Sequence, residues 1–343
     1  MAYTTIDKPS DYFNTKLYTG NGSTQSITGV GFKPDATFFK QRTGSPSSSG
    51  SQFYDAIRGA TKYLSTHSAN AEATQSNGLT SFDSDGFSIG STSRINGNTQ
   101  SYVTWNWLAN GTGSANTDGS INSTVSANTT SGFSIVKFTG TGANATVGHG
   151  LGVKPKIILL KSYENGQQWS SYWSVLGATK YMRFNATNGQ STASNRWNNT
   201  EPTTSVFTVS TDGEVNTNGE NQIAYCFADV TGYSKFSSYV GNGSADGTFV
   251  YTGFSPSFVM TKRSDSTSDW LICDNKRPGY NVINKKLFAN LSQAEDSYDS
   301  FDFVSNGFKI RSSGTGHNAS GGTYIYMAFA EEPLIGDNPA TAR

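Results

Sequence analysis

The chain carries little charge and has no long apolar run. Only 15% of its 343 residues are charged, and Lys+Arg and Asp+Glu each number 25, so the formal net charge at pH 7 is zero. Without net charge no long-range field draws the chain onto nucleic acid or an anionic membrane, and we expect neither partner. No apolar stretch approaches the roughly 20 residues of a membrane-spanning helix, so we also expect no membrane insertion.

Cysteine and histidine are scarce as well. We expect the two cysteines, Cys226 and Cys273, to be free thiols in the core rather than a disulfide or a metal pair. The three histidines stand in unrelated surroundings, and no metal-ligand spacing, nucleophile motif or phosphate loop occurs. We therefore expect no metal, no cofactor and no enzymatic activity. A glycosidase-like carboxylate pair stays open because Asp296, Asp299 and Asp302 cluster.

The first residues have neither the charged region nor the apolar region of a signal peptide, which predicts synthesis in a cytoplasm.

The chain is rich in residues typical of short strands and turns. It contains 37 Gly, 17 Tyr and 21 Phe, and no long helical pattern of Leu, Ala, Glu and Lys is present. Many short strands separated by Gly- and Asn-rich turns indicate an all-β protein.

One sequence frame occurs three times. It consists of a glycine, a proline three residues later, an apolar run and a lysine: Gly31, Pro34 and Lys40; Gly152, Pro155 and Lys161; Gly253, Pro256 and Lys262. An aromatic-x-Gly-x-Gly element precedes each copy, beginning at Tyr18, Phe138 and Tyr239. Each copy spans about a hundred residues, which is long enough to bury a core of its own. The recurring residues are interpreted as structural.

Within each copy, apolar residues alternate as in strands. The last strands are Val103-Thr104-Trp105-Asn106-Trp107, Ile223-Ala224-Tyr225-Cys226-Phe227 and Ile325-Tyr326-Met327-Ala328-Phe329. This alternation predicts one face in a core, with two such sheets packed together. Hairpin turns are predicted at Asp85-Gly86, Asp212-Gly213 and Asn306-Gly307. The sequence therefore predicts three tandem antiparallel β-sandwich domains of jelly-roll-like form.

We expect the following organisation along the chain: an N-terminal docking arm at residues 1–16, repeat one at 17–111, a linker or exposed hairpin at 112–130, repeat two at 131–236, repeat three at 237–330 and an extended tail at 331–343. The proline-containing ends favour extended segments that dock on neighbouring subunits.

Two acidic motifs have a structural and a functional interpretation. Asp83-Ser84-Asp85-Gly86 resembles the start of a calcium loop, but the rest of that pattern is missing and a turn is favoured. Asp-x-x-Arg occurs at Asp55-Arg58 and Asp274-Arg277 and could bind a polar ligand, although a local ion pair that fixes a loop is favoured. In repeat two we expect Ser174 and Gly177 at the corresponding places, which would remove any ligand function from that copy.

Aromatic residues outside the alternating strands are candidates for stacking on a sugar ring. The candidates are Trp197, Trp173, Tyr280 and Tyr298, with Trp197 in Asn195-Arg196-Trp197-Asn198-Asn199 the best exposed. Trp169 and Trp270 are more typical of core positions.

The chain resembles a family of tandem-repeat phage virion proteins of unknown biochemical function, common in phages of marine bacteria and cyanobacteria. The resemblance lies in Asp7-Lys8-Pro9-Ser10-Asp11-Tyr12-Phe13-Asn14, in Tyr18-Thr19-Gly20-Asn21-Gly22 with Gly31-Phe32-Lys33-Pro34-Asp35, in Ser81-Phe82-Asp83-Ser84-Asp85-Gly86-Phe87, and in the closing Asn338-Pro339-Ala340-Thr341-Ala342-Arg343. It covers essentially the whole chain and brings no functional residues with it.

This resemblance implies a non-enzymatic protein of the virion surface, of tail-fibre or adhesin type, that contributes to host attachment. A head decoration, knob or capsid fibre protein is the alternative, and a carbohydrate-binding adhesin or depolymerase tailspike is the second. The expected partners are other virion proteins, further copies of the chain and a host surface glycan. A neutral surface and open sheet edges favour homo-oligomers.

Overall fold

The computed structural model describes residues 4–44, 51–335 and 339. Within these residues the chain is all-β: the paired strands are antiparallel and form five sheets, and the α-helices are four single turns. The prediction of an all-β antiparallel protein is confirmed. None of the described helices is long and apolar enough to cross a membrane.

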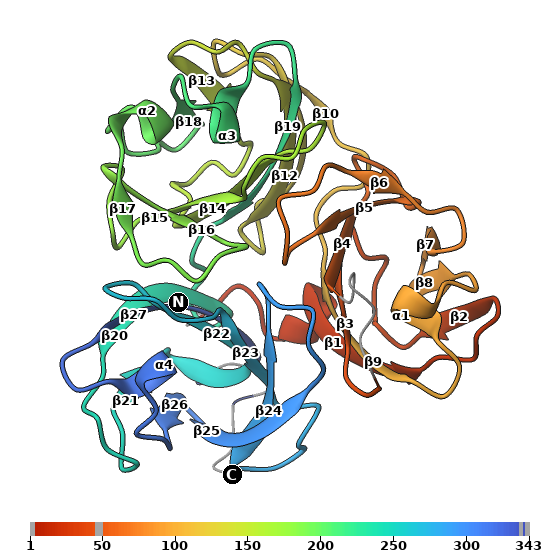
Figure 1. Ribbon diagram of the computed structural model, residues 1–343, viewed down its shortest axis with the longest axis vertical. Coiled ribbons are helices and arrows are strands. Elements are labelled where there is room, and N and C mark those ends of the chain that lie inside the picture. Colours follow the sequence, from red (N-terminus) through yellow and green to blue (C-terminus); the bar gives the residue numbers. More distant parts are fainter. Residues whose placement is uncertain (1–3, 45–50, 336–338, 340–343) are drawn as a thin grey trace.

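The strands are gathered into three lobes around a common centre, one lobe for each sequence copy (Figure 1). We call these lobes repeat 1 (β1–β9), repeat 2 (β10–β19) and repeat 3 (β20–β27).

Repeat 1 follows the 3-10 helix η1 (Pro9–Asp11) and has two sheets. Its main sheet contains, in spatial order, β1 (Phe13–Thr19), β9 (Ser101–Trp107), β3 (Ala36–Gln41), β4 (Ser51–Asp55), β5 (Lys62–Ser65) and β6 (Ala73–Thr74). Its second sheet contains β2 (Gln25–Thr28), β8 (Gly86–Ile89) and β7 (Leu79–Asp83), and α1 (Ser93–Asn96) precedes β9.

Repeat 2 has a longer main sheet. In spatial order it contains β10 (Ser114–Asn116), β11 (Ser123–Asn128), β12 (Phe133–Thr139), β19 (Asn221–Phe227), β14 (Ile157–Ser162), β15 (Ser170–Trp173), β16 (Lys180–Arg183) and β17 (Ser191–Thr192). Its second sheet pairs β13 (Ala145–Gly148) with β18 (Val206–Val209), and its helices are α2 (Ser194–Trp197) and α3 (Gly213–Asn216).

In repeat 3 the strands join into one curved sheet. In spatial order it contains β20 (Ser234–Val240), β27 (Thr323–Pro333), β22 (Phe254–Arg263), β23 (Leu271–Asp274), β24 (Ile283–Phe288), β25 (Asp296–Val304), β26 (Gly307–Ile310) and β21 (Phe249–Tyr251). Helix α4 (Thr315–Asn318) precedes β27.

The three repeats share one topology. The strand order β1-β9-β3-β4-β5 recurs as β12-β19-β14-β15-β16 and as β20-β27-β22-β23-β24. The strand register fixes which residues correspond, because Trp107 pairs with Ala36, Phe227 with Ile157 and Phe329 with Phe258. Equivalent residues in the three repeats can therefore be compared one by one.

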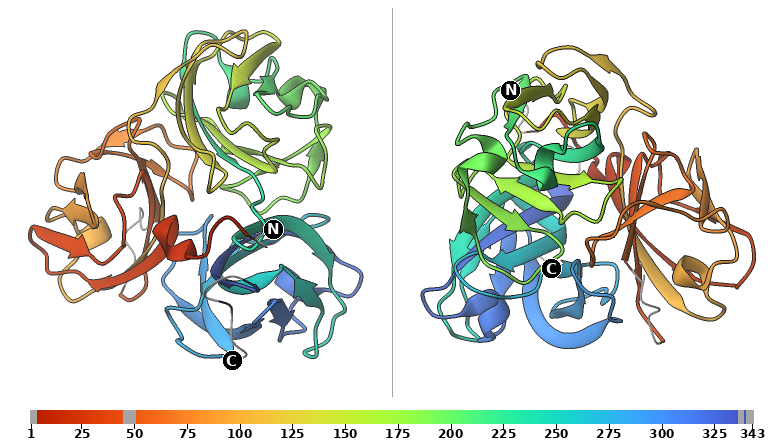
Figure 2. Two further views of the ribbon diagram at one scale, coloured as in Figure 1. Left: turned by 180° about the vertical axis from the view of Figure 1, so that it is seen from behind. Right: turned by 45° about the horizontal axis from the view of Figure 1, so that its top comes forward.

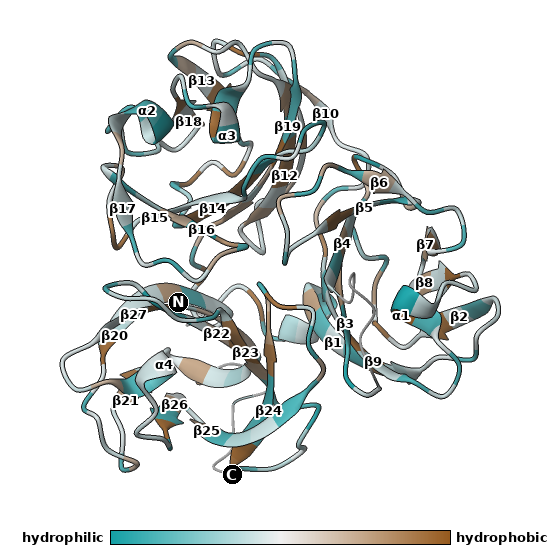
Figure 3. Cartoon of the chain, in the orientation of Figure 1, coloured by the Kyte–Doolittle hydropathy of each residue, from teal (hydrophilic) through white to brown (hydrophobic). Residues whose placement is uncertain are grey.

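Each main sheet is buried on both faces. One face packs within its own repeat, where the cores are separate. The other face points to the centre, where all three repeats contribute to one core. Trp107, Phe227 and Phe329, which occupy equivalent positions, meet there with ring centroids 6.1–6.3 Å apart. Figure 3 shows hydrophobic residues along β12, β22 and β23, which belong to these main sheets.

The central core changes the interpretation of the last strand in each repeat. The alternation predicts that the large residues of these strands, such as Trp105 and Tyr225, face the interior of a sandwich. They lie instead in the core that the three repeats share. The smaller residues of β19, Ala224 and Cys226, face the core of their own repeat. Both Cys226 and Cys273 are buried free thiols, as predicted.

A buried asparagine at the end of α1, α3 and α4 explains the aromatic-x-Gly-x-Gly element. The side-chain oxygens of Asn96, Asn216 and Asn318 accept the backbone N–H of Asn21, Thr141 and Asn242, the residue between the two glycines, at 2.8–3.0 Å. The first glycine of each element must lack a side chain. A Cβ at Gly20, Gly140 or Gly241 would lie 2.2–2.4 Å from a carbonyl oxygen just beyond that asparagine.

Three predicted boundaries are corrected. The described part of the predicted docking arm, residues 4–16, packs on the chain's own repeats: β1 begins at Phe13, Ile6 lies in the central core and η1 packs near β27. Figure 2 shows this N-terminal segment where the lobes meet. Of the segment 112–130, residues 114–116 and 123–128 form β10 and β11, which pair antiparallel at the edge of repeat 2, as in the hairpin alternative and not as in a linker. Repeat 3 begins at Ser234, and β27 continues to Pro333.

Two of the three predicted hairpin turns are present. Asp212-Gly213 is not a hairpin turn: Asp212 caps α3 by accepting the N–H of Glu214 at 2.9 Å. Asp85-Gly86 and Asn306-Gly307 do connect paired strands. Most of the tail after residue 335 lies outside the described residues.

Candidate functional site

The lysines of the threefold sequence frame join neighbouring repeats. Lys161 of repeat 2 donates to the carbonyl oxygen of Ala69 in repeat 1 at 3.2 Å, and Lys262 of repeat 3 donates to that of Thr187 in repeat 2 at 3.1 Å. Lys40 of repeat 1 donates to the carbonyl oxygen of Leu291 in repeat 3, which closes the cycle. Burial lowers the pKa of Lys40 to about 7 and those of Lys161 and Lys262 to about 8.

The glycines and prolines of the frame shape the approach to these strands. Gly31, Gly152 and Gly253 have φ between 72° and 92°, a region that favours glycine. Pro34 and Pro155 stand just before β3 and β14, whereas Pro256 lies inside β22 at a shift in strand register.

The Asp-x-x-Arg motifs form buried ion pairs at two of the junctions between repeats. Arg58 contacts Asp55 at 2.5 Å, and Asp55 also accepts the hydroxyl of Tyr225 from repeat 2 at 2.6 Å. Arg277 contacts Asp274 at 2.7 Å, and Asp274 accepts the indole N–H of Trp105 from repeat 1 at 3.2 Å.

Repeat 2 has no such pair at its equivalent positions. In the strand register, Trp173 of repeat 2 occupies the position that Asp55 has in repeat 1, and Leu176 therefore occupies that of Arg58. The expected equivalents, Ser174 and Gly177, are wrong. Trp173 instead packs on Trp270 of repeat 3, with centroids 5.7 Å apart. These residues hold the repeats together.

Two of the predicted sugar-stacking residues are buried. Trp197 and Trp173 are each 2% exposed. Trp197 packs against Tyr172 in the core of repeat 2, because the short helix α2 turns its ring inward. Neither side chain is available as a surface platform, so these two candidates are wrong.

The other two predicted aromatics are exposed. Tyr280 is 83% exposed on the loop between β23 and β24, and Tyr298 on β25 is 43% exposed. Tyr298 lies at a pocket, whereas Tyr280 is not among the residues that line it.

The carboxylates of the acidic motifs make hydrogen bonds and ion pairs within the fold. Asp85 accepts the backbone N–H groups of Gly29 and Gly31 at 2.9 and 2.7 Å, which lowers its pKa and fits a turn. Asp296 pairs with Lys286 at 3.2 Å and Asp302 with Arg311 at 3.3 Å. Over residues 4–44, 51–335 and 339, no group of three or more His, Cys, Asp or Glu side chains is placed to hold a metal ion.

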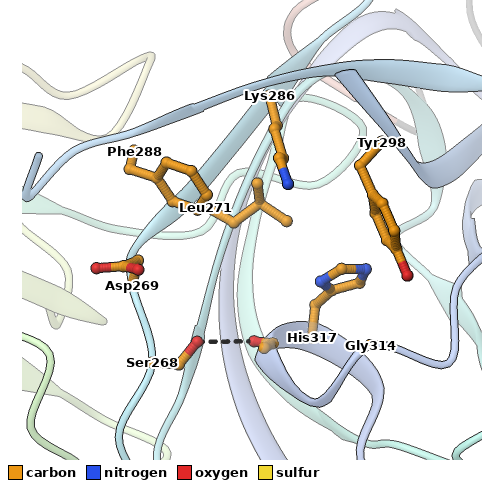
Figure 4. A pocket seen from close by; sticks show the side chains of 9 residues that line it. Ser268, Asp269, Leu271, Lys286, Phe288, Tyr298, Gly314 and His317 are labelled. Atoms are coloured by element: carbon orange, nitrogen blue, oxygen red, sulfur yellow. Dashed lines mark hydrogen bonds between the residues drawn. The ribbon is translucent and has the colours of Figure 1, made fainter. Parts of the chain in front are cut away.

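The pocket in repeat 3 is the candidate site. It has a volume of about 260 Å³. Its wall is built by β23, β24, β25, α4 and the loops that lead to them, and consists of Ser268, Asp269, Leu271, Lys286, Phe288, Tyr298, Gly314, Gly316 and His317. Figure 4 shows these side chains around the cavity, with Asp269 and Tyr298 on opposite sides and Lys286 between them.

Hydrogen bonds and ring contacts hold the wall in place. Lys286 lies 4.9 Å from the ring centroid of Tyr298, in addition to its ion pair with Asp296. The hydroxyl of Tyr298 accepts that of Ser312 at 2.9 Å. Asp269 accepts the side-chain amide of Asn290 at 2.8 Å. The polar groups of the pocket are therefore pre-positioned.

His317 is the buried polar residue of the pocket. It is 7% exposed, and among the described residues its Nε2 has no hydrogen-bond partner. Its ring lies against Tyr298 and Phe301, with centroids 6.0 and 5.9 Å away. Burial, with a smaller contribution from the nearby Lys286 charge, lowers its pKa to about 4. At neutral pH the imidazole is uncharged.

A comparison of the repeats shows why the pocket is open. Gly316 is the second residue of α4, and the equivalent residues of α1 and α3 are Arg94 and Glu214. Arg94 reaches Tyr63, with its guanidinium 5.7 Å from the ring centroid. Glu214 accepts the hydroxyl of Ser170 at 3.0 Å and pairs with two arginines. In repeat 3 no side chain extends from this position.

Sequence reasoning singled out Tyr298 but missed Lys286, Asp269 and His317. The signal that could have found them lies in the short helix before the last strand, whose second residue is Arg94 in repeat 1, Glu214 in repeat 2 and Gly316 in repeat 3. It becomes visible only when the short helices of the three repeats are aligned on their terminal asparagine.

No curated protein was found to match the chain. A family sequence model with the description "Domain of unknown function (DUF7483)" matches residues 8–333, nearly the whole chain, and the chain therefore belongs to this family.

Proposed function

We propose that the chain is a non-enzymatic structural protein of a bacteriophage virion, a tail-fibre or adhesin-type component that contributes to host attachment. The resemblance of its repeats to phage virion proteins motivates this proposal. Its partners are other virion proteins and further copies of itself, and its place is on the virion surface.

The observation that carries the proposal is the shared core. Trp107, Phe227 and Phe329 meet at the centre, and buried lysines link each repeat to the preceding one. A body fixed in this way holds its loops in constant relative positions. That property suits a particle component that must present a surface without deforming.

The finer architecture is part of the proposal. We take each repeat to be one antiparallel β-sandwich of jelly-roll-like form. The separate apolar core of each repeat, between its main sheet and its smaller strands, supports this interpretation.

Carbohydrate binding is the second candidate function. The pocket of repeat 3 favours it, because an exposed aromatic ring, a carboxylate and an ammonium group surround a cavity of about 260 Å³. Aromatic and polar groups arranged in this way are typical of small-ligand sites.

The test is to locate the chain on particles of the phage that encodes it. Antibodies against the purified chain should label the distal tail in negative-stain micrographs and should reduce adsorption to host cells. Labelling of the head would replace the tail assignment with the decoration alternative. Purified particles without the chain would overturn a virion role altogether.

A further inference from the structure

We infer that the pocket of repeat 3 binds one uncharged sugar residue, such as a terminal hexose of a surface glycan. This inference deepens the proposed attachment function, and rests on it for its biological role, by naming the class of ligand.

The cavity is a built feature of repeat 3. The residue that fills this place in repeats 1 and 2, Arg94 or Glu214, is Gly316 here. The backbone at Gly316 does not require glycine: it lies in α4, and a Cβ there would meet only the hydroxyl of Ser268, at 3.3 Å. The absence of a side chain therefore leaves open space at this place.

The size of the cavity limits the ligand. Ligand pockets for drug-sized molecules have volumes of about 300–1,000 Å³. At about 260 Å³, this cavity is just below that range and is suited to a single ring rather than an extended molecule.

The polar groups of the wall match hydroxyls. Lys286 donates, and Asp269 has carboxylate oxygens that accept. A hydroxyl both donates and accepts, and several hydroxyls on one ring can satisfy groups on different sides of the cavity.

The charges of the wall disfavour an anionic ligand. Lys286 carries one positive charge, but Asp296 already pairs with it at 3.2 Å, and Asp269 adds a negative charge across the cavity. An anionic ligand would be repelled by Asp269 and gains little from Lys286, whose charge is already paired with that of Asp296. His317 is neutral at physiological pH and does not change this balance.

The apolar part of the wall suits the faces of a sugar ring. Leu271, Phe288 and Tyr298 line the same cavity as the polar groups. Tyr298 is 43% exposed, so part of its ring is free to meet a ligand at the mouth. The C–H face of a pyranose can cover such a surface while its hydroxyls bond the polar groups.

Saturation-transfer difference NMR on the full chain tests the inference. The probes are free hexoses, deoxyhexoses and N-acetylhexosamines as the uncharged panel, and uronic acids and sialic acid as the anionic panel. We expect binding of at least one uncharged sugar. Gly316→Glu, which restores the side chain of repeat 2, should weaken that binding by at least about tenfold.

Matched variants separate the pocket from other aromatic surfaces. Tyr298→Ala should weaken binding, whereas Tyr280→Ala, which removes the more exposed tyrosine outside the pocket, should leave it unchanged. Thermal melting of each variant must match that of the parent within error, so that loss of binding reports on the site. Binding of anionic sugars alone, binding that survives Gly316→Glu, or no binding in either panel would overturn the inference.

This experiment uses the purified chain and does not depend on where the chain is located. Sugar binding by a chain that is absent from particles would remove the attachment function and leave the pocket assignment standing. A chain present on the tail that binds no sugar would do the reverse.

Discussion

A single position in the short helix before the last strand behaves differently in each repeat. Arg94 reaches an aromatic ring, Glu214 pairs with two arginines, and Gly316 leaves a cavity. The backbone around the position is the same, and an asparagine follows two residues later in each case. The chemistry of one side chain therefore decides whether this place stabilises the fold or is open to a ligand.

His317 should make the protein less stable in acid. The folded-state pKa is about 4, below the ordinary 6.5, so between these values the unfolded chain binds a proton that the folded chain does not. The free energy of unfolding therefore falls as the pH drops from about 6.5 to about 4, by roughly 3 kcal/mol from this residue.

His317→Ile, which introduces the residue of repeat 1 at this position (Ile95), removes that term. Urea unfolding at pH 7, 6, 5 and 4 should show that the free energy of unfolding of the variant rises relative to that of the parent each time the pH is lowered. Equal pH dependence in the two proteins would show that the imidazole takes up its proton at the same pH in the folded and the unfolded chain. The other histidines are present in both proteins and cancel in the comparison.

At the scale of the elements, the buried asparagine at the end of each short helix (Asn96, Asn216 or Asn318), which we call the asparagine clasp, connects parts of a repeat that are far apart in sequence. Asn216 sits at the end of α3, yet its side chain binds the loop after β12: it accepts the N–H of Thr141 and donates to the carbonyl oxygen of Ala143 at 2.6 Å. It also donates to the carbonyl oxygen of Ser210 at 2.9 Å. The position of the short helix therefore depends on one residue.

Asn216→Ala should destabilise the protein by about 2–4 kcal/mol, because three backbone groups lose their partner in a buried place. Asn218→Ala, an exposed residue two positions later, is the control and should change stability by less than about 0.5 kcal/mol. Urea denaturation followed by circular dichroism gives both values. If both substitutions lower the stability by an equal and small amount, water molecules replace the hydrogen bonds of the Asn216 side chain.

The strands could be predicted from the sequence better than their surroundings. Alternation in β9, β19 and β27 correctly indicated strands with one face of large residues, but it does not encode which neighbour covers that face. The neighbour is another repeat, and this follows only from the packing of distant segments. Asp212-Gly213 misled for a local reason: aspartate is as well suited to cap a helix as to begin a turn.

The candidate site was predicted less well. Trp197 is surrounded in sequence by polar residues, which suggested exposure, but the single turn of α2 points its ring inward. Tyr298 was singled out correctly as an exposed aromatic, while its partners in the pocket lie on β24 and α4. A cavity left by a missing side chain has no motif of its own.

At the scale of the molecule, the three repeats are joined by one shared core. The central core takes residues from all three, and the N-terminal segment adds Ile6 and Phe13 to it. Phe13 stacks on Phe329 of repeat 3, with centroids 4.5 Å apart. Loss of any one repeat would expose apolar surface on the other two.

Phe329→Ala should therefore lower the stability of the whole chain by about 3–5 kcal/mol and keep a single unfolding transition. Tryptophan fluorescence, which reports on all repeats, and far-UV circular dichroism should give coincident curves in urea. A variant in which repeat 3 melts first while repeats 1 and 2 keep their transition would contradict the shared core. Val240→Ala, at a residue that is largely exposed on β20, is the control.

The cyclic order of the lysine contacts restricts how such a protein can evolve. Solenoid arrays gain or lose units by recombination because each unit needs only its neighbours along the chain. Here Lys40 of the first unit binds the last, so the row of units is closed into a ring. A gene that duplicated or deleted one unit would encode a protein that must close a ring of another size, with different angles between neighbouring units, whereas substitutions in the outer loops leave the ring contacts unchanged.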